Sequence, residues 1–290
     1  MNHPCTLPNG LSVHHLNEYE TTFLYSEIFV DKIYSRHGIK LSPGACVLDI
    51  GANIGLFSLF IKQLEPSARI FTIEPSPDHR RVLESNLASY AKSVTILSCG
   101  MGESDRTETF TYYPGCSVFS GFHADIDQDR LALATVIRNQ LQERSNGQHE
   151  VSERAVELHV GDRLEGAREF DCQVRNISSL IREWGLESID LLKIDAEKSE
   201  CGILKGIDDD DWPKVRQIVL EAHDQETTRE IVSCLRDRGF VVRTQAEGAF
   251  ADSGFVNIYA VRQSAAVGES GACRHTNDDL AATALASVQR

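Results

Sequence analysis

The chain has 290 residues, of which 41% are hydrophobic, and its 43 acidic and 29 basic side chains give a formal charge of −14 at pH 7. This balance disfavours phosphate backbones and anionic lipid surfaces, so we expect neither a nucleic acid nor a membrane as partner. The sequence has no apolar run of membrane-spanning length, and its first ten residues are polar, which together predict a cytoplasmic protein.

The first segment, residues 1–40, precedes the predicted core. It contains NEYETTFLYSEIF and DKIYSRHG, in which the spacing of apolar and aromatic residues predicts one or two short helices. We expect this segment to form a helical lid.

Short apolar runs and helical patterns alternate along residues 41–262. The apolar runs are bounded by turn residues and read ACVLDI, ARIFTIE, SVTILS, SIDLLKID and VRQIVLEAHD. The helical patterns span residues 54–64, 78–90, 198–206 and 226–238. Such alternation predicts a parallel sheet with crossover helices, and strands this apolar must be covered on both faces. We therefore predict an α/β fold with a doubly wound, Rossmann-like sheet.

Three segments depart from this alternation. Residues 113–155 read as a loop and an amphipathic helix, and this insertion after the third strand is expected to cover the site or the acceptor. After the last helix, GFVVRT and FVNIYAV are close enough to pair as an antiparallel β-hairpin on one edge of the sheet. Residues 263–290 are small and polar, which predicts a flexible tail or an interdomain linker.

A glycine turn in VLDIGANIGLFS, residues 47–58, joins the first strand of the sheet to a helix. Such a turn places unpaired backbone N–H groups and the positive end of a helix dipole at the carboxyl edge of the sheet. The spacing fits neither the dinucleotide fingerprint G-x-G-x-x-G, because Asn53 and Leu56 replace two glycines, nor the phosphate-binding P-loop. The form D-x-G-x-[GN]-x-G remains, and its residues are Asp49, Gly51, Asn53 and Gly55. The alternative is a strand–helix turn that binds nothing.

A carboxylate ends the next predicted strand. Glu74 in RIFTIEP lies where an acidic residue accepts hydrogen bonds from ribose hydroxyls in other nucleoside-binding α/β folds. Alternatively, it caps the helix that begins at Pro75-Ser76-Pro77. Because ligands bind outside the carboxyl ends of the strands, we expect Glu74, the glycine loop and the turn Ser98-Cys99-Gly100 to surround one nucleoside.

Several of these segments together resemble the FkbM-type family of class I S-adenosylmethionine-dependent methyltransferases. They are DIGANIGLFS, the EP after the second strand, SGF after the third, IDLLKIDAEKSECGILKGI and VLEAHD, and the resemblance covers residues 10–262. The LPNG, NEYETTFLYSEIF and YYP stretches also resemble the O-methyltransferase domains of modular polyketide and mixed polyketide-peptide synthases. The chain departs from the family pattern D-x-E-G-x-E, because Lys198 follows Glu197.

The resemblance implies a seven-stranded class I methyltransferase fold, in which the terminal hairpin supplies reversed sixth and seventh strands. It implies S-adenosyl-L-methionine as cofactor, with the glycine loop at its amino-acid end, Glu74 at the ribose and Ser98, Cys99 and Gly100 at the adenine. The expected acceptor is a hydroxyl of a polyketide-like β-hydroxyacyl intermediate, possibly held on an acyl carrier protein, and the enzyme is expected to be a monomer or weak oligomer. Another small molecule, a sugar hydroxyl and a non-catalytic nucleoside-binding module are the alternatives, whereas the broken dinucleotide fingerprint disfavours a nicotinamide oxidoreductase.

Methyl transfer to oxygen requires an aligned acceptor and a group that removes its proton. His223 in IVLEAHD is the candidate general base, because histidine has an unperturbed pKa near 7 and this residue follows the fifth strand. Glu221 or Glu197 would orient it, and Asp195 would contact cofactor or acceptor or cap the next helix. Magnesium held by Asp195, Glu197, Asp224 and Glu221 is the alternative, but acidic residues are common in this chain, so we predict a metal-free mechanism.

The insertion offers further candidates for the acceptor side of the site, with ordinary packing as an equally good interpretation. These candidates are His123, Tyr112, Tyr113, Phe119 and Phe122.

Overall fold

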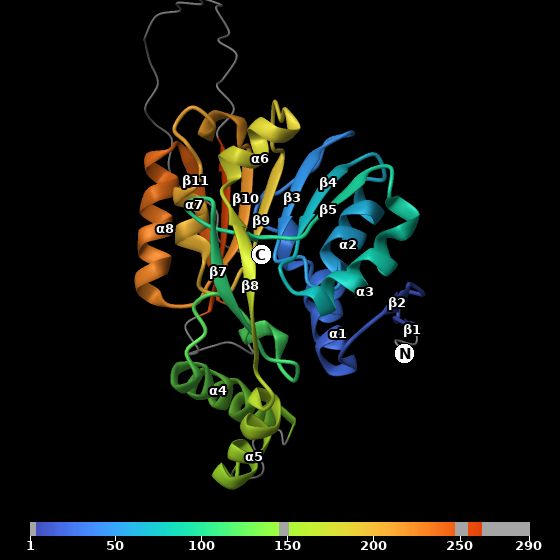
Figure 1. The fold of residues 1–290 in the computed structure, drawn as a ribbon, viewed down its shortest axis with the longest axis vertical. Helices are drawn as coiled ribbons and strands as arrows, with labels where there is room; N and C mark the ends of the chain where they lie inside the picture. The colour runs from blue at the N-terminus through green and yellow to red at the C-terminus, as the bar shows by residue number, and fades with distance from the viewer. Residues whose placement is uncertain (1–3, 145–150, 247–254, 263–290) are drawn as a thin grey trace, which may run out of the picture.

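The computed structural model describes residues 4–144, 151–246 and 255–262, so the tail predicted at 263–290 lies outside the described residues. Its main sheet has seven strands in the order β11-β12-β10-β9-β3-β4-β5 (Figure 1). The strands are β3 (Cys46–Ile50), β4 (Arg69–Ile73), β5 (Val94–Leu97), β9 (Leu191–Ile194), β10 (Gln217–Ala222), β11 (Phe240–Gln245) and β12 (Val256–Arg262). The predicted doubly wound sheet is confirmed, and its strand order reverses between β3 and β9, which is where such sheets bind ligands.

The terminal hairpin is confirmed, with one correction to its direction. β11 and β12 pair antiparallel, but β12 also lies beside β10 and runs antiparallel to it. Only β12 is therefore reversed, and β11 runs in the same direction as β10 at the edge of the sheet. The expectation that both strands are reversed is wrong for β11, because the chain places its last strand inside the sheet rather than at the edge.

Helices cover both faces of the main sheet and make three layers. The helices are α2 (Leu56–Leu64) and α3 (Pro77–Leu87) on one face and α6 (Ile177–Trp184), α7 (Glu200–Lys205) and α8 (Gln225–Asp237) on the other. Short 3-10 turns lie at Ala88–Tyr90 and Trp212–Lys214. Successive residues of β3 point to opposite faces, so Val47 packs with α2 and α3 whereas Leu48 packs with α6, α7 and α8.

The N-terminal segment contains the predicted short helix and an unpredicted hairpin. The hairpin pairs β1 (Pro4–Thr6) with β2 (Ser12–His14), and α1 (Glu18–Tyr25) follows. Asn17 caps α1, because its side chain accepts hydrogen bonds from the N–H groups of Tyr19 and Glu20. A π-helical turn Ser26–Val30 and a 3-10 turn Ile33–Ser35 continue the chain. Tyr25 and Tyr34 join the core under α2, so this segment packs on the sheet's α2 face.

The insertion forms a separate small layer at one end of the molecule. A three-stranded sheet pairs β8 (Arg168–Arg175) with β6 (Gly100–Met101) and β7 (Arg106–Tyr112). Figure 1 shows β7 and β8 reaching from the main sheet to two helices, α4 (Ile126–Arg144) and α5 (Glu153–Leu164), which share a core. The helix predicted in the insertion is confirmed as α4, whereas α5 and the small sheet were not predicted. Within residues 4–144, 151–246 and 255–262, no helix is long and apolar enough to cross a membrane.

Candidate active site

The glycine loop after β3 has the backbone that the sequence predicts. Gly51, Asn53 and Gly55 have φ angles of +74°, +51° and +89°, all in the left-handed region. Asparagine tolerates this region better than other non-glycine residues, which explains how Asn53 replaces the middle glycine. Gly51 has a second reason to be glycine, because a Cβ atom there would lie 1.7 Å from the backbone oxygen of Asp195. The loop and the end of β9 are therefore in direct backbone contact.

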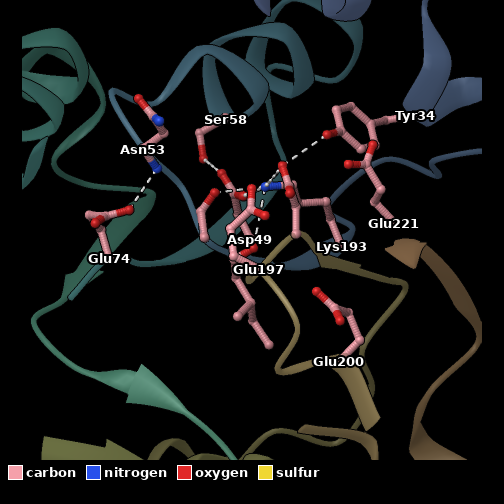
Figure 2. Close-up of polar contacts among 12 residues, drawn as sticks. Tyr34, Asp49, Asn53, Ser58, Glu74, Lys193, Glu197, Glu200 and Glu221 are labelled. Carbon is pink, nitrogen blue, oxygen red and sulfur yellow. Dashed lines mark hydrogen bonds and ion pairs between the residues drawn. The ribbon is translucent and has the colours of Figure 1, made fainter. Parts of the chain in front are cut away.

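Glu74 is held at the carboxyl end of β4 by two backbone donors. Its Oε2 accepts a hydrogen bond from the N–H of Asn53 at 2.8 Å, and its Oε1 accepts one from the N–H of Ser76 at 2.8 Å (Figure 2). Burial raises the pKa of Glu74 to about 7, although both donors favour the charged form. Glu74 therefore contacts the glycine loop and the backbone of Ser76. The alternative that Glu74 itself caps the following helix is wrong, because Ser76 holds the cap position of α3, and the ribose contact stays a prediction.

Asp49 lies beneath the glycine loop rather than in front of it. It is fully buried, and its Oδ2 accepts a hydrogen bond from Ser58 Oγ at 2.7 Å. Lys193 on β9 is its partner in the strand register, and the Lys193 Nζ lies 3.3 Å from Asp49 Oδ1. The same Nζ donates a hydrogen bond to the carbonyl oxygen of Gly51 at 2.8 Å. Asp49 and Lys193 thus fix the loop from behind.

Lys193 is a buried site residue that the sequence analysis did not identify. Its Nζ also lies 3.4 Å from Asp195 Oδ2, so one ammonium group joins the carboxylates of Asp49 and Asp195. Burial lowers the pKa of Lys193, but the two carboxylates outweigh burial and raise the pKa above its usual value. The signal was present in LLKID, because lysine is rarely buried inside an apolar strand unless it is paired.

Asp195 connects the site to the N-terminal segment. Its Oδ2 accepts a hydrogen bond from the Tyr34 hydroxyl at 3.1 Å, and Tyr34 is buried in the 3-10 turn after α1 (Figure 2). The alternative that Asp195 caps the following helix is not what the structure shows, because Ser199 holds the cap position of α7. Asp195 is therefore oriented by tertiary contacts.

His223 lies among three carboxylates. Its Nε2 is 2.9 Å from Glu197 and 3.7 Å from Glu221, and its Nδ1 is 3.4 Å from Glu200 on α7. Glu200 is fully buried and matches the last glutamate of the pattern D-x-E-G-x-E, but the sequence analysis assigned it no role, because its contact with His223 depends on how α7 packs against β10. Burial lowers the pKa of His223, but Glu200 and Glu197 outweigh burial and raise it well above its usual value. Burial likewise raises the pKa of both Glu197 and Glu221.

One cavity joins most of the predicted residues at the carboxyl ends of the strands. The predicted residues that line it are Gly51, Asn53, Glu74, Cys99, Gly100, Asp195, Glu197 and Glu221. His223 lines an adjoining pocket instead, and Glu197 lines both the cavity and this pocket. Glu197 is thus one link between the main cavity and His223, and Glu221, which lines the cavity 3.7 Å from His223 Nε2, is another.

The remaining predicted residues have other surroundings. Gly55 holds the N-cap position of α2, and Ser98 is exposed, where its hydroxyl accepts a hydrogen bond from Arg80. Asp224 caps α8, since its Oδ1 accepts hydrogen bonds from the N–H groups of Glu226 and Thr227, both at 2.8 Å. Gly55, Ser98 and Asp224 do not line the cavity.

The insertion supplies one wall of the cavity. Its lining includes Tyr112, Phe119 and Phe122, whereas His123 lines the adjoining pocket and Tyr113 packs in the core of α4 and α5. The Phe122 ring lies directly on Gly100, because a Cβ atom at that glycine would be 2.3 Å from the ring. Gly100 therefore provides flat backbone against which a ring can lie.

A second link that the sequence analysis missed joins the N-terminal segment, the insertion and the glycine loop. Ser117 in the insertion donates its N–H and hydroxyl to the Glu20 carboxylate on α1, at 2.6 and 2.8 Å. The Asn53 side chain donates a hydrogen bond to the Ser117 hydroxyl at 3.2 Å. Glu20, Ser117 and Asn53 all line the cavity, so the three segments meet around it.

The comparisons with known proteins show the family of this chain. Residues 49–242 match the family described as the methyltransferase FkbM domain. The chain belongs to the FkbM family. As an FkbM-family protein it is a methyltransferase, with S-adenosyl-L-methionine as its methyl donor. The order of its sheet, with β12 reversed, confirms the predicted class I methyltransferase fold.

Two curated relatives differ greatly in length. The 31-O-demethyl-FK506 methyltransferase FkbM of Streptomyces tacrolimicus is 35% identical over 257 residues, which cover 88% of this chain and 95% of that protein. The AMB antimetabolite synthetase AmbE of Pseudomonas aeruginosa is 43% identical over 264 residues, or 88% of this chain, but the match spans only 12% of that protein. This FkbM-family chain is thus similar to a whole methyltransferase and to a small part of a large synthetase.

Solved structures show similarity in fold alone. A precorrin-6y C5,15-methyltransferase from Geobacter metallireducens is 16% identical, with a TM-score of 0.42 over 80% of this chain and 86% of that one. Fibrillarin from Aeropyrum pernix, solved with bound S-adenosyl-L-methionine, is 12% identical, with a TM-score of 0.40 over 90% of this chain and 82% of that one.

The residues of the FkbM-family cavity fit this methyl donor chemically. S-adenosyl-L-methionine carries a positive sulfonium, an ammonium group and ribose hydroxyls, all of which are complemented by carboxylates. The cavity presents the carboxylates of Glu74, Asp195, Glu197 and Glu221 around a glycine loop that allows close backbone approach.

Proposed function

We propose that the protein transfers a methyl group from S-adenosyl-L-methionine to a hydroxyl of a natural-product intermediate, of polyketide-like β-hydroxyacyl type. The observation that carries this proposal is the single cavity that joins the glycine loop and Glu74 to Glu197 and Glu221. A donor-binding half and a proton-accepting half thus face one space. The name of the Streptomyces relative, a 31-O-demethyl-FK506 methyltransferase, supports oxygen as the acceptor atom.

Presentation of the acceptor on a carrier protein is part of the proposal. Its support is the similarity to a small part of the AmbE synthetase, because such a segment works beside other parts of one large chain. The insertion would then cover the acceptor, since Phe119 and Phe122 already line the cavity. A free hydroxyl substrate, such as another small molecule or a sugar, is the alternative outcome of the test below.

The predicted binding roles remain proposals. In these, Glu74 accepts hydrogen bonds from the ribose, the glycine loop holds the amino-acid end, and Cys99 and Gly100 flank the adenine. When bound, the cofactor supplies an electrophilic methyl group on a positive sulfur. The Asp195 carboxylate would favour that positive charge, and Glu221 would do so once it has released its proton, because both residues line the same cavity at the ends of β9 and β10.

The proton of the acceptor hydroxyl would pass to the paired Glu197 and His223. His223 as the sole base stays a prediction, and the surrounding carboxylates favour its protonated form, which accepts no further proton. Glu197 lines the cavity and lies 2.9 Å from His223, so the two groups can share a proton as one unit. We propose no metal in this step, because Asp224, one of the four candidate ligands, is committed to capping α8.

The first test measures donor binding and methyl transfer together. Isothermal titration with S-adenosylhomocysteine and with NAD should show binding of the former only. Mass spectrometry should show the gain of one methyl group on a β-hydroxyacyl thioester, tested free and on a carrier protein. Transfer to the carrier-bound acceptor alone would support tethering. Transfer to neither acceptor, with intact binding of S-adenosylhomocysteine, would contradict the proposed reaction.

The second test changes the proposed proton acceptor. His223→Gln should lower kcat by roughly two orders of magnitude or more, because general base catalysis contributes about 10²- to 10⁴-fold. The kcat of the wild type should rise with pH through the apparent pKa of the Glu197 and His223 pair, since the base must be unprotonated. His159→Gln, on the exposed side of α5, is the matched control. Unchanged turnover of the His223→Gln enzyme would remove this residue from the mechanism.

A further inference from the structure

Two consecutive residues after β9 have backbone angles that residues with a side chain rarely adopt. Glu197 and Lys198 have φ angles of +43° and +68°, in the left-handed region where glycine is favoured. Non-glycine residues persist there only when surrounding contacts hold them, and such residues gather at functional sites. The loop departs from the family pattern D-x-E-G-x-E at Lys198. The contacts of Lys198 should therefore explain why a lysine occupies the position of the glycine.

Lys198 forms an ion pair with a buried carboxylate of the insertion. Its Nζ lies 2.7 Å from Oδ1 of Asp129 on α4, and the Asp129 side chain is only 1% exposed. The other oxygen, Oδ2, accepts hydrogen bonds from the N–H of Asp125 at 3.0 Å and from the Tyr113 hydroxyl at 3.4 Å. In the part of the chain that the structure describes, Lys198 is the one basic side chain within ion-pair distance of Asp129. A buried carboxylate needs such a partner, so the pair is a strong link between the loop and α4.

A second contact joins the insertion to Glu197 itself. A Cβ atom at Gly121 would lie 3.1 Å from the backbone oxygen of Glu197 and 3.4 Å from its Cβ atom. Gly121 is fixed in turn by two backbone hydrogen bonds with Thr111, the N–H of each donating to the carbonyl oxygen of the other. The insertion thus packs against the Glu197 backbone while it holds the neighbouring Lys198 side chain.

These contacts surround Glu197, a carboxylate that links the cavity to His223. Glu197, Lys198, Asp129, Gly121 and His223 all line the adjoining pocket. Glu197 also lines the main cavity, and Figure 2 shows it among the polar residues of the site. A shift of α4 would therefore be transmitted through Asp129 and Lys198 to the Glu197 carboxylate.

We infer that Lys198 is a positioning residue, which through its ion pair with Asp129 couples the insertion to the Glu197 carboxylate. The inference rests on the proposed function, in which Glu197 and His223 accept the proton of the acceptor. It implies that an acceptor seated against the insertion sets the geometry of this pair. Misplacement of a reacting group by about 1 Å is enough to lower a rate by about 100-fold.

The test compares three variants with one matched control. Asp129→Asn keeps the side-chain shape without leaving a buried charge, Lys198→Met removes the cation, and Lys198→Arg keeps it. The control, Arg138→Met, breaks an exposed ion pair with Glu153 between α4 and α5, away from the loop. Asp129→Asn and Lys198→Met should lower kcat by about 10- to 100-fold, with the affinity for S-adenosylhomocysteine unchanged. Lys198→Arg should retain most of the activity, and Arg138→Met should change kcat by less than about twofold.

A second readout does not depend on turnover. The imidazole of His223 is faced by Glu197 from the loop, Glu200 from α7, Glu221 from β10 and Asp224 at the start of α8. Loss of the ion pair should move Glu197 away, so NMR titration should place the pKa of His223 lower in Asp129→Asn than in the wild type, with Arg138→Met unchanged. The His223 imidazole resonance is identified by its absence from the spectrum of the His223→Gln variant.

The outcomes separate the inference from the proposed function. A wild type that binds S-adenosylhomocysteine but methylates no hydroxyl contradicts the proposed function, and the His223 titration then decides the inference alone. An Asp129→Asn protein with unchanged kcat and an unchanged His223 titration overturns the inference. Equal loss of cofactor affinity and kcat in Asp129→Asn also overturns it, because the pair would then support the fold as a whole. If Lys198→Met does not fold, Asp129→Asn and Lys198→Arg decide the result.

Discussion

Single residues of the glycine loop combine two physical demands that the sequence signals unequally. The left-handed backbone could be predicted from Gly51, Asn53 and Gly55, because few other residues adopt it. The contact of Gly51 with the backbone of Asp195 could not, because the two are distant in the sequence and meet only in the folded sheet. The contact of Glu200 with His223 likewise depends on the fold, although the place of Glu200 in the pattern D-x-E-G-x-E was a readable signal, as was the lone lysine in LLKID.

The close approach at Gly51 gives a direct prediction. Gly51→Ala adds a methyl group where the backbone oxygen of Asp195 would lie 1.7 Å away, so the chain must move. Gly185→Ala is the matched control, because Gly185 also has a left-handed φ of +58° but has no atom within 4 Å of its Cβ position. The control should cost about 1–2 kcal/mol of unfolding free energy for the left-handed backbone alone. Gly51→Ala should cost roughly 3 kcal/mol or more, because core strain is added.

Urea unfolding of both variants measures these differences, and titration with S-adenosylhomocysteine tests the site. The Gly51→Ala protein should bind the ligand more weakly than Gly185→Ala, because Gly51 lines the cavity and Gly185 ends α6. Equal stability and equal affinity of the two variants would contradict the backbone contact.

At the scale of elements, burial decides which parts of the fold were predictable. The strands of the main sheet are buried on both faces, so they read as continuous apolar runs, and the helices over them show clear periodicity. The small sheet carries a weaker signal, because β7 and β8 alternate between exposed and buried positions. Apolar residues alternate with polar ones in β8 at Phe170, Cys172 and Val174, but the polar neighbours interrupt any continuous apolar run, so this strand was not predicted. The place of β12 inside the sheet depends on strand pairing, for which its residues carry no local signal.

The elements around the cavity are tied to one another by polar contacts rather than by the sheet. Tyr34 reaches Asp195 from the N-terminal segment, and Glu20 on α1 meets Ser117 of the insertion. Lys198 holds α4 through Asp129. The N-terminal segment and the insertion are therefore coupled to the ends of β3 and β9. This coupling explains why the residues of one site come from segments that the sequence places far apart.

For the whole molecule, the pattern of charge matters more than its sum. The net charge of −14 predicts poor binding of anions, but it does not show that buried carboxylates gather in one cavity. Burial raises the pKa of Glu74, Glu197 and Glu221, and neighbouring carboxylates raise the pKa of His223 against the effect of burial. At a pH between its unfolded and folded pKa values, each of these four groups therefore holds a proton in the folded state that it has released in the unfolded chain.

Because the pKa of each of these groups is raised on folding, we can predict how the free energy of unfolding depends on pH. A carboxyl whose pKa rises from 4.5 to about 7 on folding, as for Glu74, makes the folded state less stable as pH rises through that interval. The stabilisation from His223 is complete below 6.5 and is lost above it. His79 opposes this trend only between about 4 and 6.5, because burial lowers its pKa to about 4. The free energy of unfolding should therefore fall above pH 6.5, by about 1.4 kcal/mol per pH unit for each extra proton held by the folded state.

Urea unfolding from pH 6.5 to 8 measures this slope, and one substitution assigns it to the cavity. Glu221→Gln keeps the shape of the side chain but removes a carboxyl with a raised pKa and one of the negative neighbours of His223, so the slope should decrease. Glu153→Gln is the control, because that exposed carboxyl has a lowered pKa from its ion pair with Arg138 and stays charged throughout this range. A slope that is the same in the wild type and in Glu221→Gln would show that Glu221 is already ionised below pH 6.5. In that case the ionisation of Glu221 would not raise the affinity for the cationic donor between pH 6.5 and 8.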